Sequence, residues 1–572
     1  MVMFSCRIII LLFSCLFAES VLPTQYIVGP NQIRYATHGW PSRNYIDLRH
    51  GPDGSLFAGT NSGLGKINAL PYNLSESEIE YNLYKIIDPN LPEGGNPAVK
   101  TYPLNDGNML IIVSGITSID DPDELCMSGS DAFCQVGTGI SWSVDSGETW
   151  KYMEQPSLQN NNKFECAFNN EVSCFDATWG GISYEHGVWS GYYDEKRVAN
   201  VAFEVAADTN YEYIYAANWY GLLKRFKYTS ENPTWESVPL PRNSDDTFDC
   251  SDFPPDNYYY GPAFDDNHRP FSVEISDGYI WVGSLGVNKG EIIGEHCINW
   301  THYTTDNTSN NYNYQMPSDW VTGIYTQKLN TGIRIWTINW TETIGAHHLA
   351  YTDNYGQNWR REPYFSNDGS VRAVVYNLYS VDSNLNDGID SEDNLYASTS
   401  KGLFKFESLN NWVKEDIANN DIFNEMGIFN ENNPDFEVQA LIIDQNKNFL
   451  IGTTFGLLVR DPSNQFYYPS YVDDYIAGNL ISRVYPNPYL LDSHNHATFS
   501  VSSTNSGKLE VYDFSMSKVF NGDCDFDNGQ NLDCKWFGLN NRGERVNNGV
   551  YFLKVETDGK TYWEKLGVVK FK

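Results

Sequence analysis

The sequence predicts an all-β protein, the larger part of which is a seven-bladed β-propeller. The first observation is a repeat. Five stretches share a polar turn, a short apolar strand, a turn that closes on glycine and a second strand. They are residues 53–67, 211–226, 277–292, 393–406 and 446–460. The second observation is that Gly, Asn, Pro and Asp interrupt almost every run before three helical turns accumulate. Short strands at regular spacing without helices between them favour a radially closed fold.

Two further stretches, residues 108–115 and 332–340, carry the first strand of the repeat without its full glycine ending. One position in each first strand is then taken as equivalent: Phe57, Ile112, Ile214, Ile280, Ile335, Leu395 and Phe449. This gives seven units, which we expect within residues 21–478. The gap between the second and third units is long and contains four cysteines, so we expect a disulfide-stapled insertion near residues 116–200.

Two octets, residues 143–150 and 352–359, have the form Ser/Thr-x-Asp/Asn-x-Gly-x-Thr/Asn-Trp. In each octet the Asp or Asn side chain can bond the amides of a turn, the glycine can take the bend, and the tryptophan can pack beneath it. The pattern resembles the Asp-box of sialidase-like and related propellers. That resemblance implies a structural hairpin turn away from the active site, so it supports the fold and assigns no catalytic role.

Residues 1–20 are typical of an export signal, because Arg7 precedes an apolar run that ends at Phe17 and a site of small residues follows. The run is too short to span a bilayer, and no later stretch has membrane length. We therefore expect cleavage after Ser20 and a mature chain with no membrane-spanning segment. A lipoprotein acylated at Cys15 is the open alternative.

Cleavage after Ser20 would leave eight of the ten cysteines, an even number that favours disulfides in an exported chain. Six form close pairs and two remain as a fourth candidate pair: Cys126 with Cys134, Cys166 with Cys174, Cys524 with Cys534, and Cys250 with Cys297. None of these spacings is Cys-x-x-Cys. A structural zinc site is therefore disfavoured.

A different pattern follows Ser482, and it opens with "VYPNPY". Each proline lacks a backbone donor and forces the preceding residue into an extended conformation, so we expect a stiff domain boundary here. Further on, a set of residues stands in a fixed order: Trp536, Gly538, Asn540, Gly543, Gly549, Val550, Tyr551 and Lys565. This segment resembles the C-terminal sorting domain of bacterial type IX secretion substrates and the immunoglobulin-like domain of the flagellar hook-capping protein.

The resemblance covers residues 479–572 and implies a small Ig-like β-sandwich that directs the chain to outer-membrane secretion machinery. It also implies a bacterial protein that is secreted or displayed on the outer cell surface. The sequence departs from the family pattern in two places. Met516 stands where glycine is usual, and an insertion separates Cys524 from Cys534.

Within that insertion, acidic residues follow one another at short intervals: Asp523, Asp525, Asp527 and Asp533. Carboxylates on alternate residues converge when a loop turns, as in calcium-binding loops, although Gly529 stands one place later than an EF-hand requires. Calcium is therefore the one candidate cofactor. The open alternative is an acidic solvated loop closed by the disulfide.

The net charge of −35 excludes nucleic acid as a partner, because phosphates would be repelled and no Lys/Arg cluster offers an exception. No catalytic residue is assigned. Sialidases need an arginine triad, and Arg269-Pro270 is the nearest fragment of their motif here, while acidic pairs are uninformative in so acidic a chain. Aromatic-rich loops at residues 188–193, 256–262 and 310–317 are better candidates for ligand contacts. The open alternative is that these rings pack between long insertions and the propeller face.

Binding of a glycan or a protein on the loop face of the propeller, after export by a type IX-like system, is the leading functional hypothesis. Fold alone does not decide function, so two alternatives stay open. One is a secreted glycoside hydrolase or lyase of sialidase-like architecture. The other is a surface component of the secretion apparatus, because the repeat also resembles the two-component-regulator type of propeller repeat.

Overall fold

The computed structural model describes residues 45–60, 63–70, 74, 83–86, 88–120, 133–155, 163–165, 172–189, 201–218, 222–253, 261, 265–340, 346–366, 369–381, 393–417, 437–453, 456–467, 482–485, 489–491, 496–501, 505–514, 517–524, 532–557 and 559–570. The chain divides into two units. The first comprises residues up to Lys414 with Glu437–Tyr467, and the second comprises Glu415–Phe436 with Tyr468–Lys572. The predicted leader and the predicted boundary at residues 478 and 479 lie outside the described residues.

The described part of the first unit contains seven antiparallel sheets of four or five strands, each built from one continuous stretch of chain. The first sheet contains β1 (Tyr45–His50), β2 (Leu56–Thr60), β3 (Gly63–Ile67) and β4 (Leu83–Lys85). The second sheet contains β5 (Val99–Pro103), β6 (Met109–Asp120), β7 (Phe133–Ser143) and β8 (Lys151–Met153). The third sheet contains β12 (Ala202–Asp208), β13 (Tyr213–Asn218), β14 (Leu223–Lys227) and β15 (Glu236–Val238). The fourth sheet contains β16 (Thr247–Phe248), β17 (Ser272–Ser276), β18 (Tyr279–Ser284), β19 (Gly286–Gly294) and β20 (Cys297–Tyr303). The fifth sheet contains β21 (Val321–Leu329), β22 (Gly332–Trp340), β23 (His347–Thr352) and β24 (Arg360–Glu362). The sixth sheet contains β25 (Val375–Val381), β26 (Asn394–Thr399), β27 (Gly402–Ser408) and β28 (Asn411–Lys414), and the seventh contains β29 (Val438–Ile443), β30 (Phe449–Thr453), β31 (Leu457–Arg460) and β32 (Phe466–Tyr467).

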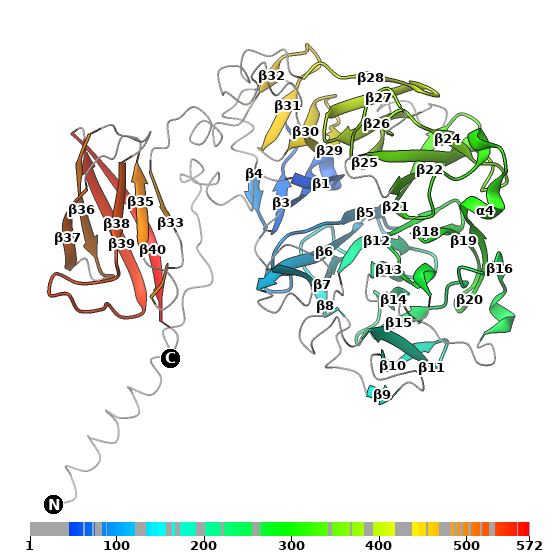
Figure 1. The fold of residues 1–572 in the computed structure, drawn as a ribbon, viewed down its shortest axis with the longest axis horizontal. Helices are drawn as coiled ribbons and strands as arrows, with labels where there is room; N and C mark the ends of the chain where they lie inside the picture. The colour runs from blue at the N-terminus through cyan, green and yellow to red at the C-terminus, as the bar shows by residue number, and fades with distance from the viewer. Residues whose placement is uncertain are drawn as a thin grey trace, which may run out of the picture. The chain divides into compact units, whose positions relative to one another are not determined.

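One edge strand of each sheet lies at the centre of a ring (Figure 1). These innermost strands are β1, β5, β12, β17, β21, β25 and β29. Each contacts the next, and β29 contacts β1, so the ring is closed. The first and last sheets share no strand. The all-β prediction is confirmed, and the first unit is a β-propeller.

The middle strands are buried on both faces because each sheet packs between two neighbours. Every residue of β2, "LFAGT", and of β13, "YIYAAN", is buried. Apolar clusters accordingly lie between consecutive sheets, and one joins Leu110, Ile112 and Trp142 of the second sheet to Ile214 and Phe226 of the third. Strands buried on both faces read as continuous apolar runs, which is why the repeat was visible in the sequence.

The seven residues taken as equivalent do lie on the second strands of seven different sheets, but they are not at one level. Each second strand carries a buried polar residue after its apolar run: Thr60, Ser114, Asn218, Ser284, Asn339, Thr399 and Thr453. Five of the chosen residues stand four places before it, whereas Phe57 stands three places and Ile112 two places before it. Leu56 and Leu110 are therefore the true equivalents. An apolar run buried on both faces does not mark its own register.

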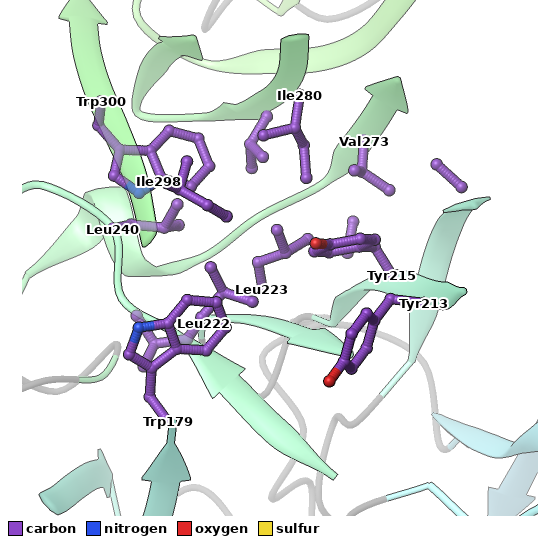
Figure 2. Packing of buried hydrophobic residues seen from close by; sticks show 14 of the residues in the cluster. Trp179, Tyr213, Tyr215, Leu222, Leu223, Leu240, Val273, Ile280, Ile298 and Trp300 are labelled. Atoms are coloured by element: carbon purple, nitrogen blue, oxygen red, sulfur yellow. The ribbon is translucent and has the colours of Figure 1, made fainter. Parts of the chain in front are cut away.

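Inside the predicted insertion, a three-stranded sheet of β9 (Lys163–Glu165), β10 (Val172–Trp179) and β11 (Ile182–Trp189) precedes β12. Its β10 contacts β15 of the third sheet. Figure 2 shows Trp179 of β10 beside Leu222 and Leu223, with Ile298 and Trp300 of the fourth sheet in the same cluster. The insertion is thus attached to the propeller through its apolar core.

Helical structure is confined to single turns in the described residues. They are η2 (Pro52–Gly54), η4 (Cys250–Asp252), η5 (Asp266–His268), α4 (Thr305–Thr308) and η6 (Tyr312–Tyr314). Asp249, Asp265 and Asn311 cap three of these turns by accepting a backbone N–H bond. Short polar residues of this kind favour caps and turns over longer helices.

The two octets adopt one hydrogen-bond pattern, between β7 and β8 and between β23 and β24. The Asp145 carboxylate accepts from Ser143 Oγ at 2.7 Å, from the Thr149 amide at 2.9 Å and from Thr149 Oγ1 at 2.5 Å. In the second octet the side-chain oxygen of Asn354, Oδ1, accepts from Thr352 Oγ1 at 3.0 Å and from the backbone amide of Asn358 at 2.9 Å. Gly147 and Gly356 take positive φ angles of 92° and 88°, which glycine adopts without strain.

Replacing Asp145 with alanine is expected to lower the free energy of unfolding of the propeller by about 1 kcal/mol, because the Ser143 and Thr149 donors of the turn lose their acceptor. Asp145→Asn should cost less, since Asn354 fills the same place in the second octet. Burial alone would raise the pKa of Asp145, but hydrogen bonds from Thr149 and Ser143 outweigh it and hold the pKa below its ordinary value of 3.8. The ionised form therefore stabilises the turn above pH 3.8, and this contribution is lost as the pH falls further.

Urea unfolding of both variants at neutral pH measures the difference. Equal losses in Asp145→Ala and Asp145→Asn would contradict the assigned bonding.

The described part of the second unit is a sandwich of two sheets. One contains β33 (Ser482–Tyr485), β35 (Ala497–Val501) and β38 (Leu532–Trp536). The other contains β34 (Tyr489–Leu490), β36 (Gly507–Tyr512), β37 (Lys518–Cys524), β39 (Gly549–Thr557) and β40 (Lys560–Val569). A buried cluster that includes Phe499, Trp536 and Leu553 draws on both sheets.

The sequence placed the first edge of this sandwich at the prolines, and the structure corrects that position. Ser482–Tyr485 already forms β33, at the edge of one sheet, and Tyr489–Leu490 forms β34, at the edge of the other. Residues 486–488, which include both prolines, lie outside the described residues.

Candidate functional site

Five of the seven innermost strands carry a β-bulge near their first residue. The register shifts lie in β1, β12, β21, β25 and β29. The extra residues with described side chains are Phe203, Thr322, Tyr376 and Gln439. A bulge releases one residue from the ladder and re-aims its side chain, and bulges are frequent beside functional sites. The starts of the innermost strands therefore present side chains that the sheets do not use for pairing.

Three aromatic rings lie at the starts of β12, β17 and β21, and we call them the aromatic arc: Phe203, Phe271 and Trp320. The ring centroids of Phe203 and Phe271 are 6.4 Å apart with planes inclined by 26°, and those of Phe271 and Trp320 are 5.8 Å apart at 78°. Phe203 is 36% exposed and the other two are half-buried. Contiguous exposed rings offer a ligand a large apolar contact area at small entropic cost.

The starts of β25 and β29 carry polar groups instead. Gln439 Nε2 donates to Glu437 Oε1 at 3.3 Å, and the Tyr376 hydroxyl also bonds Glu437. Burial and this bond raise the pKa of Tyr376, so its hydroxyl remains a donor at neutral pH. The same end of the ring thus combines apolar rings with hydrogen-bonding groups.

Five charged side chains of β1, β5, β12 and β17 form an inner charge network: Asp47, Arg49, Lys100, Glu204 and Glu274. Lys100 Nζ lies 3.3 Å from Glu204 Oε1 and 3.5 Å from Glu274 Oε2. Arg49 Nη1 lies 3.0 Å from Asp47 Oδ1. Three carboxylates thus face two cations, which leaves the network with an excess of negative charge when all groups are ionised.

Burial affects the charged groups of the network differently. Burial alone would lower the pKa of Lys100, but Glu204 and Glu274 outweigh it and hold the pKa above its ordinary value. Asp47 and other negative neighbours do the same for Arg49. Burial raises the pKa of Asp47 to about 6 despite the lowering effect of Arg49. The cations therefore stay charged at neutral pH, whereas Asp47 changes its protonation in mildly acidic solution.

Asp47→Asn is expected to remove one pH-dependent part of the stability of the propeller. Between the ordinary pKa of 3.8 and the folded value of about 6, the folded state holds a proton that the unfolded state has lost. The free energy of unfolding therefore falls as the pH rises through this range. Two pKa units correspond to about 3 kcal/mol.

The measurement is the difference in urea unfolding between the wild type and Asp47→Asn, at about pH 4 and about pH 7. The variant should gain relative to the wild type as the pH rises. A difference that stays constant over this range would contradict the raised pKa of Asp47.

The aromatic loops singled out in the sequence are only partly described. Residues 190–193, 256–260 and 262 lie outside the described residues. In the third loop Tyr312 and Tyr314 are 51% and 42% exposed. The Arg361 guanidinium carbon lies 3.9 Å from the Tyr312 ring centroid. The loop therefore packs on β24 through a cation–π contact between this guanidinium and the tyrosine ring.

The sequence reasoning missed the aromatic arc, although a signal was present. An aromatic residue stands at the start of the innermost strand in three consecutive repeats, within "AFEVA", "PFSVE" and "DWVTG". The repeat is most evident from its second strand onward, and these positions on the innermost strands lie before it.

The structure contains two disulfides among its described residues. Cys250 of η4 is bonded to Cys297 at the start of β20, within the fourth sheet. Cys524 at the end of β37 is bonded to Cys534 of β38, which links the two sheets of the sandwich. Cys134 and Cys174 lie on β7 and β10, but their predicted partners Cys126 and Cys166 lie outside the described residues.

The predicted calcium ligands are only partly visible. Asp523 and Asp533 are exposed and each stands next to a disulfide cysteine, while Asp525 and Asp527 lie outside the described residues. In the part of the chain that the structure describes, no three His, Cys, Asp or Glu side chains are grouped as metal ligands. Calcium binding therefore stays a prediction.

The sheets define a β-propeller followed by a β-sandwich, and the arc and the charge network lie on and beside the innermost strands of the propeller. No known protein family and no curated protein matches the sequence. No helix of the described residues is long and apolar enough to cross a membrane.

Several solved structures are similar at low identity. The extracellular domain of a one-component system of B. thetaiotaomicron is 11% identical with a TM-score of 0.41, over 94% of this chain and 58% of its own length. This chain therefore spans less than two thirds of that structure. PorZ, a surface component of the type IX secretion system of Porphyromonas gingivalis, is 12% identical over 92% of this chain and 99% of its own, with a TM-score of 0.20.

The β-propeller domain of Cps50 (Swd1) from Myceliophteria thermophila is 9% identical over 73% of this chain and 94% of its own, with a TM-score of 0.36. Because these TM-scores are all below 0.5, the fold assignment rests on the strand pairing of this chain itself.

Proposed function

We propose that this chain is an exported binding protein of the bacterial cell surface, whose ligand contacts the aromatic arc at the propeller axis. The observation that carries the proposal is the contact of Phe203 with Phe271 and of Phe271 with Trp320, at 6.4 and 5.8 Å. Rings from three sheets meet there, and a bulge releases one of them, Phe203, from pairing. Apolar rings beside hydrogen-bonding groups form a surface suited to a sugar ring or to an extended peptide.

The charges beneath the arc support recognition of an uncharged or basic group. Glu204 directly follows Phe203 in β12, and Glu274 lies in β17 near Phe271. With Asp47 ionised, the three carboxylates of the network exceed its two cations, and the chain as a whole carries a charge of −35. An acidic ligand would be repelled on approach.

Glycan arrays and affinity capture with cell-surface fractions test the proposal, using the wild type and Trp320→Ala. Truncation of a central aromatic contact should weaken binding at least tenfold, since such residues commonly contribute about 2 kcal/mol or more. Leu409→Ala is the matched control, because Leu409 is 46% exposed and lies between β27 and β28. Equal binding by Trp320→Ala and Leu409→Ala would refute the assignment of the site.

A hydrolase is a second candidate, and the raised pKa of Asp47 favours it. A general acid must carry a proton near the working pH, and Asp47 is the carboxyl of the network whose pKa is about 6. Against this role, Asp47 is only 3% exposed and is paired with Arg49. Turnover of a polysaccharide panel that is abolished in Asp47→Asn would favour the enzyme. Binding without turnover would favour the adhesive function.

We propose further that residues 1–20 direct export and that the second unit is an address for the outer-membrane secretion machinery. Fusion of residues 479–572 to an exported reporter protein should move the reporter to the cell surface or the medium, and retention of the reporter in the periplasm would refute the proposal. Mass spectrometry of the native protein then separates two roles. Removal of the second unit indicates a cargo protein, whereas its retention indicates a component of the apparatus.

A further inference from the structure

A cleft of about 440 Å³ lies between the turns of the second and third sheets. Pro103 ends β5 and Lys151 begins β8, and the other lining residues lie in the turns that follow β5, β7, β12 and β14. Phe203 of the aromatic arc is the second residue of β12, whereas the cleft residue Thr209 follows the end of that strand. The cleft and the arc are therefore at opposite ends of the sheets.

The floor of the cleft is apolar. Leu104, Val144 and Tyr228 line it, and all three also belong to or pack against the apolar cluster between the second and third sheets. Tyr228 is 3% exposed, and its carbonyl accepts a bond from Trp142 Nε1 at 3.1 Å. The floor is thus a fixed surface, built on the core of the propeller.

The rim of the cleft carries Glu212, which has an unusual backbone. Its φ is +64°, a conformation that costs a residue other than glycine free energy. The Glu212 carbonyl accepts from the Tyr228 amide at 3.0 Å, and its Oε2 accepts from Thr229 Oγ1 at 2.9 Å. These two bonds fix both the backbone and the carboxylate of Glu212 at the cleft.

Asp106 and Lys151 complete the charged part of the rim. The Asp106 carboxylate accepts from the amide and the side-chain nitrogen of Asn108, at 2.9 and 3.0 Å, and these bonds lower its pKa. Asp106 is therefore ionised and oriented at neutral pH. Two carboxylates and one ammonium thus surround an apolar floor.

We propose that this cleft binds a neutral pyranose sugar, as a second ligand site of the propeller. The apolar floor suits the C–H face of a sugar ring, the carboxylates of Asp106 and Glu212 accept bonds from its hydroxyls, and Lys151 donates one. The volume lies in the range of small-molecule pockets. Because carboxylates outnumber ammonium groups on the rim, an acidic sugar is disfavoured.

Saturation-transfer NMR and calorimetry test this with glucose, galactose, N-acetylglucosamine and the acidic sugar glucuronate as probes. At least one neutral sugar should bind the full chain saturably, with a Kd in the region of about 1 mM. Glu212→Gly should weaken this binding at least tenfold. The variant should be no less stable than the wild type, because glycine adopts a φ of +64° without strain. Thr209→Trp should also weaken sugar binding at least tenfold, because Thr209 lies on the exposed rim and a tryptophan there fills the cleft.

Leu409→Ala is the matched control, because Leu409 is exposed and lines neither the cleft nor the arc, and it should leave sugar binding at the cleft unchanged. No transfer to any neutral sugar from the wild type would overturn the proposal. So would equal binding of glucuronate and glucose. Binding that survives Glu212→Gly but is lost in Trp320→Ala would also overturn it, and would assign the sugar to the aromatic arc.

Discussion

Arg225→Ala is expected to lower the free energy of unfolding of the propeller by about 3–5 kcal/mol, because it leaves a carboxylate without its cation in a largely buried place. Arg225 is 1% exposed. Its Nε donates to Glu236 Oε2 at 2.9 Å, and its Nη1 donates to the Tyr215 hydroxyl at 3.2 Å.

The same guanidinium lies between two aromatic rings, and this position adds to the expected loss. The Arg225 guanidinium carbon is 4.1 Å from the ring centroid of Trp179 and 3.8 Å from that of Tyr213. Trp179 belongs to the inserted sheet and Tyr213 to the third sheet of the ring. Loss of Arg225 therefore also loosens the insertion. Arg225→Lys should be as unstable as Arg225→Ala. An ammonium group is not planar, so it cannot stack between two rings while it donates hydrogen bonds in the plane of the stack.

Urea unfolding followed by tryptophan fluorescence measures the effect of Arg225→Ala. Lys227→Ala is the matched control on the same strand, since Lys227 pairs with Glu295 at 3.2 Å with both side chains more than 40% exposed. Exposed pairs contribute about 0–1 kcal/mol. Similar losses in the two variants would show that the buried position of Arg225 is unimportant.

Trp536→Ala should unfold or nearly unfold the second unit and leave the propeller intact. Trp536 is fully buried in the core between the two sheets, and its Nε1 donates to the Leu539 carbonyl at 2.9 Å. Its ring lies 5.4 Å from that of Tyr551. Removing a buried tryptophan costs about 3–5 kcal/mol, which is comparable to the whole stability of a small domain.

Phe537→Ala tests whether the position in the core decides the outcome, because Phe537 is the next residue along the chain and is 56% exposed. Limited proteolysis of the full chain should degrade the second unit of Trp536→Ala rapidly and that of Phe537→Ala at the wild-type rate. Resistance of Trp536→Ala to proteolysis would contradict the assigned core. If the second unit is the export address, surface delivery should fail for Trp536→Ala only.

The repeat and the all-β fold could be predicted because each sheet is local in sequence. β2 and β3, for example, are joined by two residues, so their pattern appears in a single short window. The turns at Asp145 and Asn354 were predictable for the same reason, since the bonds to the Asp145 and Asn354 side chains come from within each octet.

The aromatic arc and the charge network could not be predicted in this way, because ring closure brings together residues far apart in the chain. Lys100 and Glu274 are separated by 174 positions and meet only once the innermost strands surround the axis. The chain contains so many acidic residues that nothing in the sequence distinguishes Glu204 and Glu274 from the others. The change of pattern after Ser482 is local in the sequence, whereas the pairing of Ser482–Tyr485 at one sheet edge depends on residues farther along the chain.

Elsewhere in the propeller, neighbouring sheets are also consecutive in the chain. The first and the last sheets are neighbours in space but lie at opposite ends of the propeller sequence. Asn446 Nδ2 donates to the Leu70 carbonyl at 2.7 Å across 376 positions. Joining such distant segments carries a loop-closure entropy that contacts at this seam alone must offset. The seam is therefore the part of the ring that should form last and open first, and amide hydrogen exchange should be faster in β1 and β29 than in β13 or β18.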